Sequence, residues 1–481
     1  MSLLKETLKS IGFVNLRTYS HYSMMLAVGT VKDHLKAAMT LGHRGVSITD
    51  NGSMAGAIQL YSLAKEKNFP FALGVNLYIT EDILLKDPEH KYDRLVVFAK
   101  NWVGYQNLCR LISISGQEDH LYYRPRISYE ELFAHKEGLI VSSSDSASPF
   151  GHQILNQTGM EEELFLKFKN EFKNDFYVEI SLADMSRRWN KELKAFIEEE
   201  NKQEVVNKRM MELAQTHQVT AYLSMPSYMP SQDQYLIQSI SIANSPTGKD
   251  GWHFHEPQYT MSVEELYKRK NKLAPYLSDQ DFVSLCENSL KILEKTKDLQ
   301  LDLKPLLLRV SYDDHPVNQD STLETALIKL EEEFKDKDPA FSNLLKKSRG
   351  NENLQLLGDV IPELKEGLKD FVEDKALRTV LKIIVQNKKI NLEDPVYRSR
   401  LTEELNVIQN NGVVRFCDYF LPLEDVVRFH RENGYQRGFG RGSGGSSLVC
   451  YAMDISDVDP ITYDLLFSRF ITLERLGRFK F

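Results

Sequence analysis

Apolar and polar positions along the first 270 residues follow two alternating patterns, short continuous apolar runs and longer stretches with helical spacing. Helical spacing places Val31, Leu35 and Ala38 on one face of a stretch that Thr30 can cap. The apolar runs, each expected to be a strand, lie at residues 13–18, 46–49, 71–79, 95–99, 138–141, 176–180 and 221–225. Strands that alternate with helices build parallel βαβ units, and this number of strands predicts a barrel-like α/β domain. Functional side chains of such barrels lie at the carboxyl ends of the strands.

Beyond residue 257 the pattern becomes mainly helical. Residues 313–392 are heavily charged and are expected to form a helical connection. Further helices are expected at residues 395–411 and 418–433. In residues 281–300 one helical face collects Phe282, Leu285, Cys286, Leu290 and Leu293.

Composition narrows the class of protein. A chain of 481 residues suggests about three domains. Its four cysteines are far apart, so neither a zinc motif nor a disulfide framework is indicated, and we expect a reducing, cytoplasmic environment. The charged start MSLLKETLKSIGF does not resemble a secretory signal, and no apolar run is long enough to span a membrane. The net charge of -8 does not decide on nucleic-acid binding, because an acidic body can carry a local basic track.

A glycine-rich stretch, GYQRGFGRGSGGSSLVCY at residues 434–451, leads into an apolar segment that can form a helix. Such a turn exposes backbone N–H groups, which favour a phosphate together with the helix dipole. Arg441 adds a charged fork, and Ser443, Ser446 and Ser447 add hydroxyl donors. A linker or a tight turn is the alternative interpretation of such a run.

The surrounding residues 400–475 resemble the start of the palm domain in family C bacterial replicative DNA polymerases, the DNA polymerase III alpha family. The motifs that carry the resemblance are RL-x-x-EL-x-VI, YFL, GRGSG-x-x-SLV-x-Y, DP and DLLF-x-RF, in that order. The resemblance implies contacts with a nucleotide triphosphate or a primer terminus from Gly440, Arg441, Gly442, Ser443, Ser446 and Ser447.

Nucleotidyl transfer uses two Mg²⁺ ions held by clustered aspartates. In the family an Asp-x-Asp pair follows the stretch equivalent to residues 470–475, but no aspartate follows Asp464 here. We therefore expect no catalytic residue in this chain and expect the Mg²⁺ ligands on a partner segment. Asp457 and Asp459 have the right spacing, but they are expected to form a turn before Pro460.

Residues 12–266 resemble the polymerase and histidinol phosphatase (PHP) domain, which begins the same polymerases. FVNLRTYSHYS, SITDNGSMAGAIQLY, LGVNLYI, YYRPRIS and NKRMMELA carry the resemblance. Members with an active metal site have histidine and carboxylate ligands at positions that are here Asn15, Arg17, Asn51, Asn76, Met225 and Ser227. Amide, guanidinium, thioether and hydroxyl groups leave too few ligands. We therefore expect a degenerate PHP barrel without a metal and without nuclease activity.

Four other polar residues are candidates for remnants of that site. His21, His253 and His255 are each expected to be solvated or packed rather than bound to a metal. Asp50 is expected to cap a helix that begins near Ser53.

These patterns predict an α/β fold with a PHP-type distorted β/α barrel at residues 1–270, a helical connection at 271–395 and the first part of a nucleotidyltransferase-type palm at 396–481. The resemblance implies the N-terminal part of a DNA-directed DNA polymerase, which would be an enzyme only when a partner supplies the aspartates. The implied partners are a C-terminal polymerase half joined at residues 470–481, primer-template DNA, dNTPs, and, through the complete polymerase, a sliding clamp and an exonuclease subunit. A non-catalytic assembly module or relic, and a PHP phosphoesterase, remain as alternatives.

Overall fold

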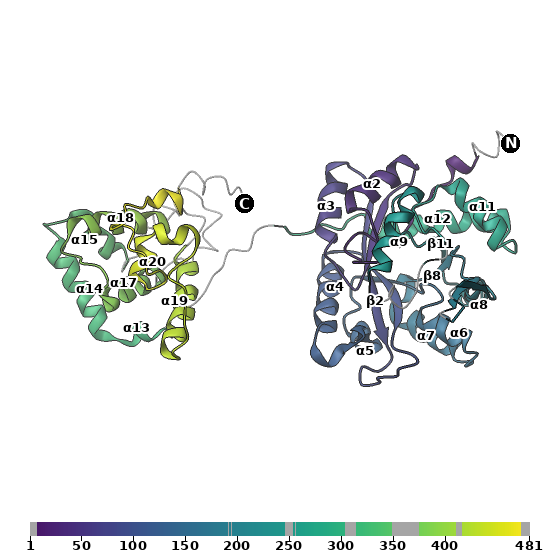
Figure 1. The fold of residues 1–481 in the computed structure, drawn as a ribbon, viewed down its shortest axis with the longest axis horizontal. Coiled ribbons are helices and arrows are strands. Elements are labelled where there is room, and N and C mark those ends of the chain that lie inside the picture. Colours follow the sequence, from purple (N-terminus) through teal and green to yellow (C-terminus); the bar gives the residue numbers. More distant parts are fainter. Residues whose placement is uncertain are drawn as a thin grey trace. The chain divides into compact units, whose positions relative to one another are not determined.

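The computed structural model describes residues 7–190, 192–193, 195–245, 254, 256–303, 314–348, 375–409 and 416–472. The chain forms two compact units, Met1–Asp302 and Leu303–Phe481 (Figure 1). Each unit is considered by itself below.

The first unit is built on one curled, seven-stranded sheet. Its strands are ordered β1 (Val46–Asn51), β2 (Phe71–Thr80), β3 (Asp93–Ala99), β7 (Leu139–Ser142), β8 (Phe176–Ser181) and β11 (Ala221–Ser224), with β6 (Ile127–Ser128) beside the end of β2. Within this sheet only β3 runs antiparallel to its neighbours. The carboxyl ends of all the other strands therefore lie at one edge, as the barrel interpretation requires.

The first expected strand, residues 13–18, is not a regular strand. Thr18 forms an isolated β-bridge with Ser227. On the other side, Thr49 N donates a hydrogen bond to Thr18 O at 2.8 Å. At Asn15 the side chain, in place of the backbone, makes the hydrogen bonds to the neighbouring segment. Its Oδ1 accepts a hydrogen bond from Met225 N at 3.1 Å, and its Nδ2 donates one to Met225 O at 2.8 Å. The segment thus joins β1 to the chain after β11 and closes the sheet into a distorted barrel.

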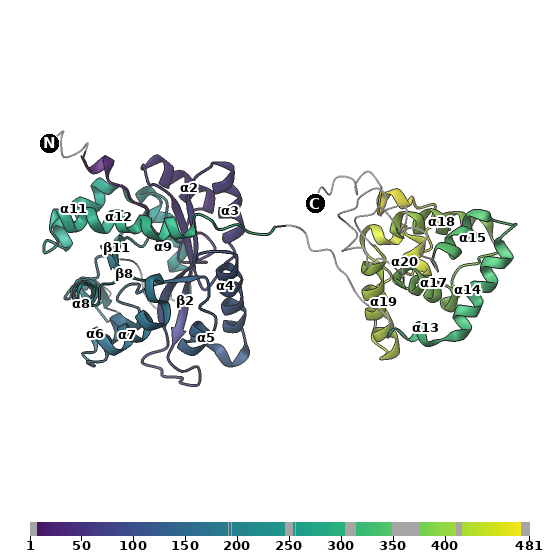
Figure 2. The ribbon, with the colours of Figure 1, turned by 180° about the vertical axis from the view of Figure 1, so that it is seen from behind.

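Helices cover the sheet on both sides. Figure 1 shows α3, α4 and α5 along one side and α6, α7 and α8 on the other, and Figure 2 shows the same arrangement from behind. The helices are α2 (Val31–Thr40), α3 (Ala57–Glu66), α4 (Trp102–Ser115), α5 (Tyr129–Ala134), α6 (Pro149–Leu155), α7 (Glu161–Phe172), α8 (Lys202–Thr216), α9 (Tyr235–Ala243), α11 (Val263–Leu273) and α12 (Asp279–Thr296). Two small hairpins pair β4 (Leu121–Tyr122) with β5 (Arg124–Pro125) and β9 (Arg187–Asn190) with β10 (Ala195–Glu198).

Local sequence explains where several of these helices begin. Thr30 caps α2 as predicted, in a capping box with Asp33. Helix α12 is capped in the same way by Ser278. It buries Phe282 and Cys286 on its predicted face and packs on the barrel, where the Ser289 hydroxyl accepts Val14 N at 3.0 Å. Although the sequence interpretation assigned residues 271–302 to the connection, they pack within the first unit.

The second unit is helical in its described residues. Its helices are α13 (Pro316–Gln319), α14 (Ser321–Phe334), α15 (Pro339–Lys347), α17 (Lys375–Asn387), α18 (Pro395–Gln409), α19 (Cys417–Glu432) and α20 (Leu448–Ala452). Leu377, Leu405 and Leu448 are fully buried in one shared core. Residues on both sides of position 395 therefore fold around a single core. None of the helices in the described ranges is long and apolar enough to cross a bilayer.

Candidate functional sites

The six positions that resemble lost metal ligands do gather at the carboxyl edge of the barrel, where they form two small groups. In the first, the Asn15 amide binds the Met225 backbone and donates to Ser227 Oγ at 2.9 Å. In the second, Asn76 Nδ2 donates to Asn51 Oδ1 at 2.8 Å and to the Tyr19 hydroxyl at 3.2 Å. Amide side chains thus bind one another and the backbone where ligands were expected.

Arg17 supplies a buried positive charge at the same place. Its side chain is 1% exposed and lies 2.8 Å from Asp145 Oδ2 and 3.0 Å from Glu179 Oε1. Its Nε donates to the Tyr19 hydroxyl at 2.7 Å. Burial opposes the charge, but attraction to Asp145, Tyr19 and Glu179 outweighs it and raises the pKa of Arg17. Arg17 is therefore charged and fully paired.

The two carboxylates around Arg17 are held by further contacts. Burial alone would raise the pKa of Asp145, but Arg17 and Arg94 outweigh it and hold that pKa below its usual value. Glu179 also accepts hydrogen bonds from Ser224 and, at 3.3 Å, from the Tyr222 hydroxyl. Both carboxylates are thus ionic partners of arginine rather than open metal ligands.

The residues at this edge do not fit the metal that active PHP domains hold. A divalent ion would have to displace the guanidinium of Arg17, and the positions that resemble ligands offer amides, a thioether and a hydroxyl. The fixed positive charge at this edge is the Arg17 guanidinium. Sequence reasoning identified Arg17 but missed Asp145 and Glu179, although Glu179 interrupts an otherwise apolar run, a signal that a buried charge has a partner.

Asp50 does not cap the helix near Ser53, and that prediction was wrong. Helix α3 begins at Ala57, and its N-terminus, with Gly56 at the N-cap position, has no side-chain cap. The Asp50 carboxylate instead accepts hydrogen bonds from the Ser20 N–H and from the Ser20 and Ser23 hydroxyls, each at 2.7 Å. Burial raises the pKa of Asp50 to about 6. The carboxylate thus anchors the loop that follows Thr18.

Of the three histidines considered as remnants, the structure describes His21. His21 is exposed and contacts the ring of Tyr22, with ring centroids 4.2 Å apart and the ring planes tilted by 35°. His253 and His255 lie outside the described residues.

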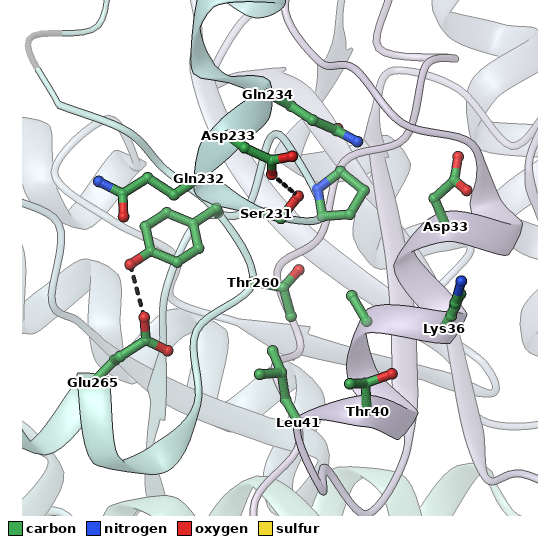
Figure 3. A pocket seen from close by; sticks show the side chains of 13 residues that line it. Asp33, Lys36, Thr40, Leu41, Ser231, Gln232, Asp233, Gln234, Thr260 and Glu265 are labelled. Carbon is green, nitrogen blue, oxygen red and sulfur yellow. Dashed lines mark hydrogen bonds between the residues drawn. The ribbon is translucent and has the colours of Figure 1, made fainter.

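A pocket elsewhere in the first unit is lined by α2, residues 230–234 and residues 259–265 (Figure 3). Its carboxylates already have structural roles. Asp33 belongs to the α2 cap, Asp233 accepts from Ser231, and Glu265 accepts from the Tyr259 hydroxyl at 2.9 Å. The pocket contains none of the predicted site residues, and its acidic groups are used to hold helix ends and turns.

In the second unit the Gly-Ser element divides into an exposed loop and a buried base. Residues 440–443 are exposed. Gly440 has φ +136° and Gly442 has φ +69°, conformations that favour glycine. A Cβ at Gly440 would lie 2.9 Å from Ser456 Oγ, so the loop passes close to that residue. Asp457 N donates to Phe439 O at 2.8 Å and fixes the entry to the loop.

The base of the element is a helix N-terminus that already holds an anion. The carboxylate of Glu404 accepts hydrogen bonds from Leu448 N at 2.8 Å, Val449 N at 3.0 Å and Ser447 Oγ at 2.8 Å. Ser447 is fully buried and Ser446 is 6% exposed. These two serines therefore lie at the buried base of the loop and not on its exposed surface. Gly440, Arg441, Gly442 and Ser443 are the predicted residues that face solvent.

Asp457 and Asp459 point to separate partners. Asp457 pairs with Arg437 at 2.6 Å. Asp459 accepts the Tyr397 hydroxyl at 2.6 Å and Ile461 N at 2.9 Å, the local pattern of a turn. This arrangement agrees with the turn interpretation and not with a shared metal.

Comparison with known families matches both units. A profile described as "PHP domain" matches residues 15–183, and one described as "Bacterial DNA polymerase III alpha NTPase domain" matches residues 367–477. The chain is 27% identical over 471 residues to the DNA polymerase III subunit alpha of Borreliella burgdorferi, covering 97% of this chain and 34% of that protein. The corresponding protein of Helicobacter pylori is 28% identical over 482 residues, with 97% and 34% covered.

The closed sheet and its carboxyl edge define the first unit as a PHP-type α/β barrel. The chain thus carries a PHP domain and a bacterial DNA polymerase III alpha NTPase domain, and its similarity to DNA polymerase III alpha subunits along 97% of its length makes it correspond to an N-terminal portion of those proteins. It spans about a third of the length of the curated relatives it matches.

Proposed function

We propose that this chain acts as the N-terminal part of a DNA-directed DNA polymerase. The observation that carries the proposal is the correspondence of nearly the whole chain, in order, to DNA polymerase III alpha subunits. In this proposal the PHP barrel is a scaffold, and the second unit presents the loop at residues 440–443 to the phosphates of a nucleotide or a primer.

The exposed loop has the chemistry for that task. Backbone N–H groups next to glycines at positive φ can approach a phosphate closely. Arg441 adds a guanidinium that can bind two phosphate oxygens, and Ser443 adds a hydroxyl donor. Glu404 and Arg400 hold the base of the loop in place. Arg400 donates to Glu404 Oε1 at 2.7 Å and to Ser446 O at 2.8 Å.

The reaction needs groups that this chain is not proposed to supply. Two Mg²⁺ ions, held by aspartates of a partner segment, would activate the primer hydroxyl and stabilise the leaving phosphate. Leu423, Val426 and Phe429 are each more than half exposed on α19 and form an apolar surface that such a segment could cover. A sliding clamp and an exonuclease subunit would bind only through the complete polymerase.

Primer extension tests the proposal. The chain alone should not extend a primer, and a mixture with the polypeptide that carries the rest of the polymerase should do so in the presence of dNTPs and Mg²⁺. Arg441→Ala should reduce extension by at least about tenfold, the effect of losing one good charge-assisted contact of about 1.4 kcal/mol. Lys337→Ala, which removes a cation 57% exposed in the same unit, is the matched control.

The outcomes separate this function from its alternatives. Reconstituted extension that is unaffected by Arg441→Ala would remove the loop assignment. A mixture that forms a complex but never extends a primer would favour the non-catalytic assembly module. Metal-dependent release of phosphate from a phosphomonoester by the chain alone would favour the phosphoesterase, which the Arg17 ion pairs with Asp145 and Glu179 argue against.

A further inference from the structure

Three side chains with metal-binding atoms meet beside the barrel, at a place separate from the six degenerate positions. They are His90 in the loop between β2 and β3, Asp93 at the start of β3, and His152 in α6. One ligand atom from each lies within 4.8 Å of the others. His90 Nε2 is 3.1 Å from Asp93 Oδ2, and the two imidazole centroids are 3.6 Å apart.

The segments that carry these side chains are fixed by other contacts. Arg94 N donates to Ala147 O at 2.8 Å, which ties the start of β3 to the turn before α6. Ser148 caps α6 through Gly151 N at 3.1 Å. The loop with His90 is braced by the buried Arg126, which donates to Ile83 O and Lys91 O, both at 2.9 Å. The three side chains are therefore brought together by the fold and not by one flexible segment.

The charges at this place favour a cation. The Asp93 side chain is 8% exposed, and the described residues give its carboxylate no lysine or arginine partner. Asp87 lies near enough to act electrostatically on both histidines. Burial and the neighbouring His90 lower the pKa of His152, whereas the hydrogen bond to Asp93 raises the pKa of His90.

We propose that His90, Asp93 and His152 form a binding site for a divalent transition-metal ion of the zinc type. Two imidazoles and one carboxylate suit such an ion and leave at least one coordination position for water or an anion. The bound ion would join the β2–β3 loop to α6. This site does not depend on the proposed function, and it does not use any of the positions that resemble the lost PHP ligands.

Metal titration of the whole chain tests the site. After treatment with a chelator, the chain should bind one Zn²⁺ ion with higher affinity than any further ions, and Co²⁺ should give the intense visible absorption of a low-coordinate site. His152→Ala and Asp93→Asn should each weaken this binding at least about tenfold, the lower end of what losing even a supporting group costs a metal site. His217→Asn is the matched control, because His217 pairs with Glu162 at 2.8 Å without a second imidazole.

The results have clear consequences for the proposal. Equal Zn²⁺ affinity in His152→Ala and in the unchanged chain would overturn it, as would the lack of any binding event that differs from weak surface binding. His90→Asn offers a second test at a side chain that is 34% exposed, and because of this exposure we expect little loss of stability. Retained circular dichroism in each variant separates loss of the site from loss of the fold.

Discussion

Arg17 offers the most direct test of how the barrel replaces a metal. Arg17→Met keeps the apolar part of the side chain but removes a buried cation that lies within 3.0 Å of both Asp145 and Glu179. Removing one partner of a buried ion pair costs about 3 to 5 kcal/mol, because the remaining charge is left without compensation. The Tyr19 hydroxyl also loses its 2.7 Å contact. We expect the first unit to lose about 3 to 5 kcal/mol of stability near pH 7.

Urea unfolding followed by tryptophan fluorescence measures this loss in the correct unit, because all three tryptophans lie in the first 302 residues. The pH dependence gives a second measurement. Arg17 and Arg94 hold the pKa of Asp145 down despite burial, so this carboxylate stabilises the fold above its unfolded pKa and loses that effect as pH falls through the folded pKa. Without Arg17, Arg94 is left to oppose the effect of burial, so the pKa of Asp145 should rise. The difference in unfolding free energy between variant and parent should therefore become smaller as the pH falls and Asp145 is protonated.

Two controls decide whether the reasoning holds. Arg187→Met breaks an exposed pair with Glu198 and should cost less than about 1 kcal/mol. In the double variant Arg17→Met with Glu179→Gln, one unpaired charge is removed, so part of the lost stability should return. A loss below about 1 kcal/mol for Arg17→Met, or a gap that does not change with pH, would refute the view that Arg17 neutralises buried carboxylates.

Two further predictions concern buried carboxylates. Glu404→Ala should destabilise the second unit by about 2 to 4 kcal/mol, measured by thermal unfolding with circular dichroism, because Leu448 N and Val449 N lose their buried acceptor. Glu404→Gln keeps one acceptor oxygen and should destabilise the unit less, and equal losses in the two variants would contradict this explanation. Asp50 has a folded pKa of about 6 against an ordinary 3.8, so the folded state retains its proton longer and stability falls as pH rises between those values, by about 3 kcal/mol in total. Asp50→Asn should remove that component from urea unfolding measured at several pH values, and an unchanged pH profile would disprove it.

The elements of the barrel were accessible from the sequence because apolar periodicity is a local signal. The exception, residues 13–18, shows where local reasoning ends. An apolar run predicts a strand, but the Asn15 amide binds the Met225 backbone 210 residues away and interrupts the ladder. Helix α12 was also predicted as a helix, but the contact between Ser289 and Val14 that places it on the barrel spans 275 residues.

For the candidate sites too, the sequence showed the local motifs but not the contacts between residues far apart in the chain. The resemblance located the six PHP positions and the Gly-Ser element, and the structure brings the PHP positions to one edge. The partners that give these places their chemistry could not be read from spacing. Glu179 lies 162 residues from Arg17, and Glu404 lies 43 residues from Ser447. Only the fold shows that these charges are paired.

Each unit contains a buried charged side chain at a place where the sequence suggested a bound ion or its remnant, and the two side chains differ in what they leave exposed. In the barrel, the sequence predicts no metal ion, and the Arg17 guanidinium lies at the same edge, enclosed by Asp145 and Glu179. In the second unit, an anion was expected at the N-terminus of α20, and the Glu404 carboxylate takes that place. Enclosure leaves Arg17 no access to a substrate, so the barrel edge is suited to support a fold. Glu404, in contrast, fixes only the base of its loop, and residues 440–443 remain exposed.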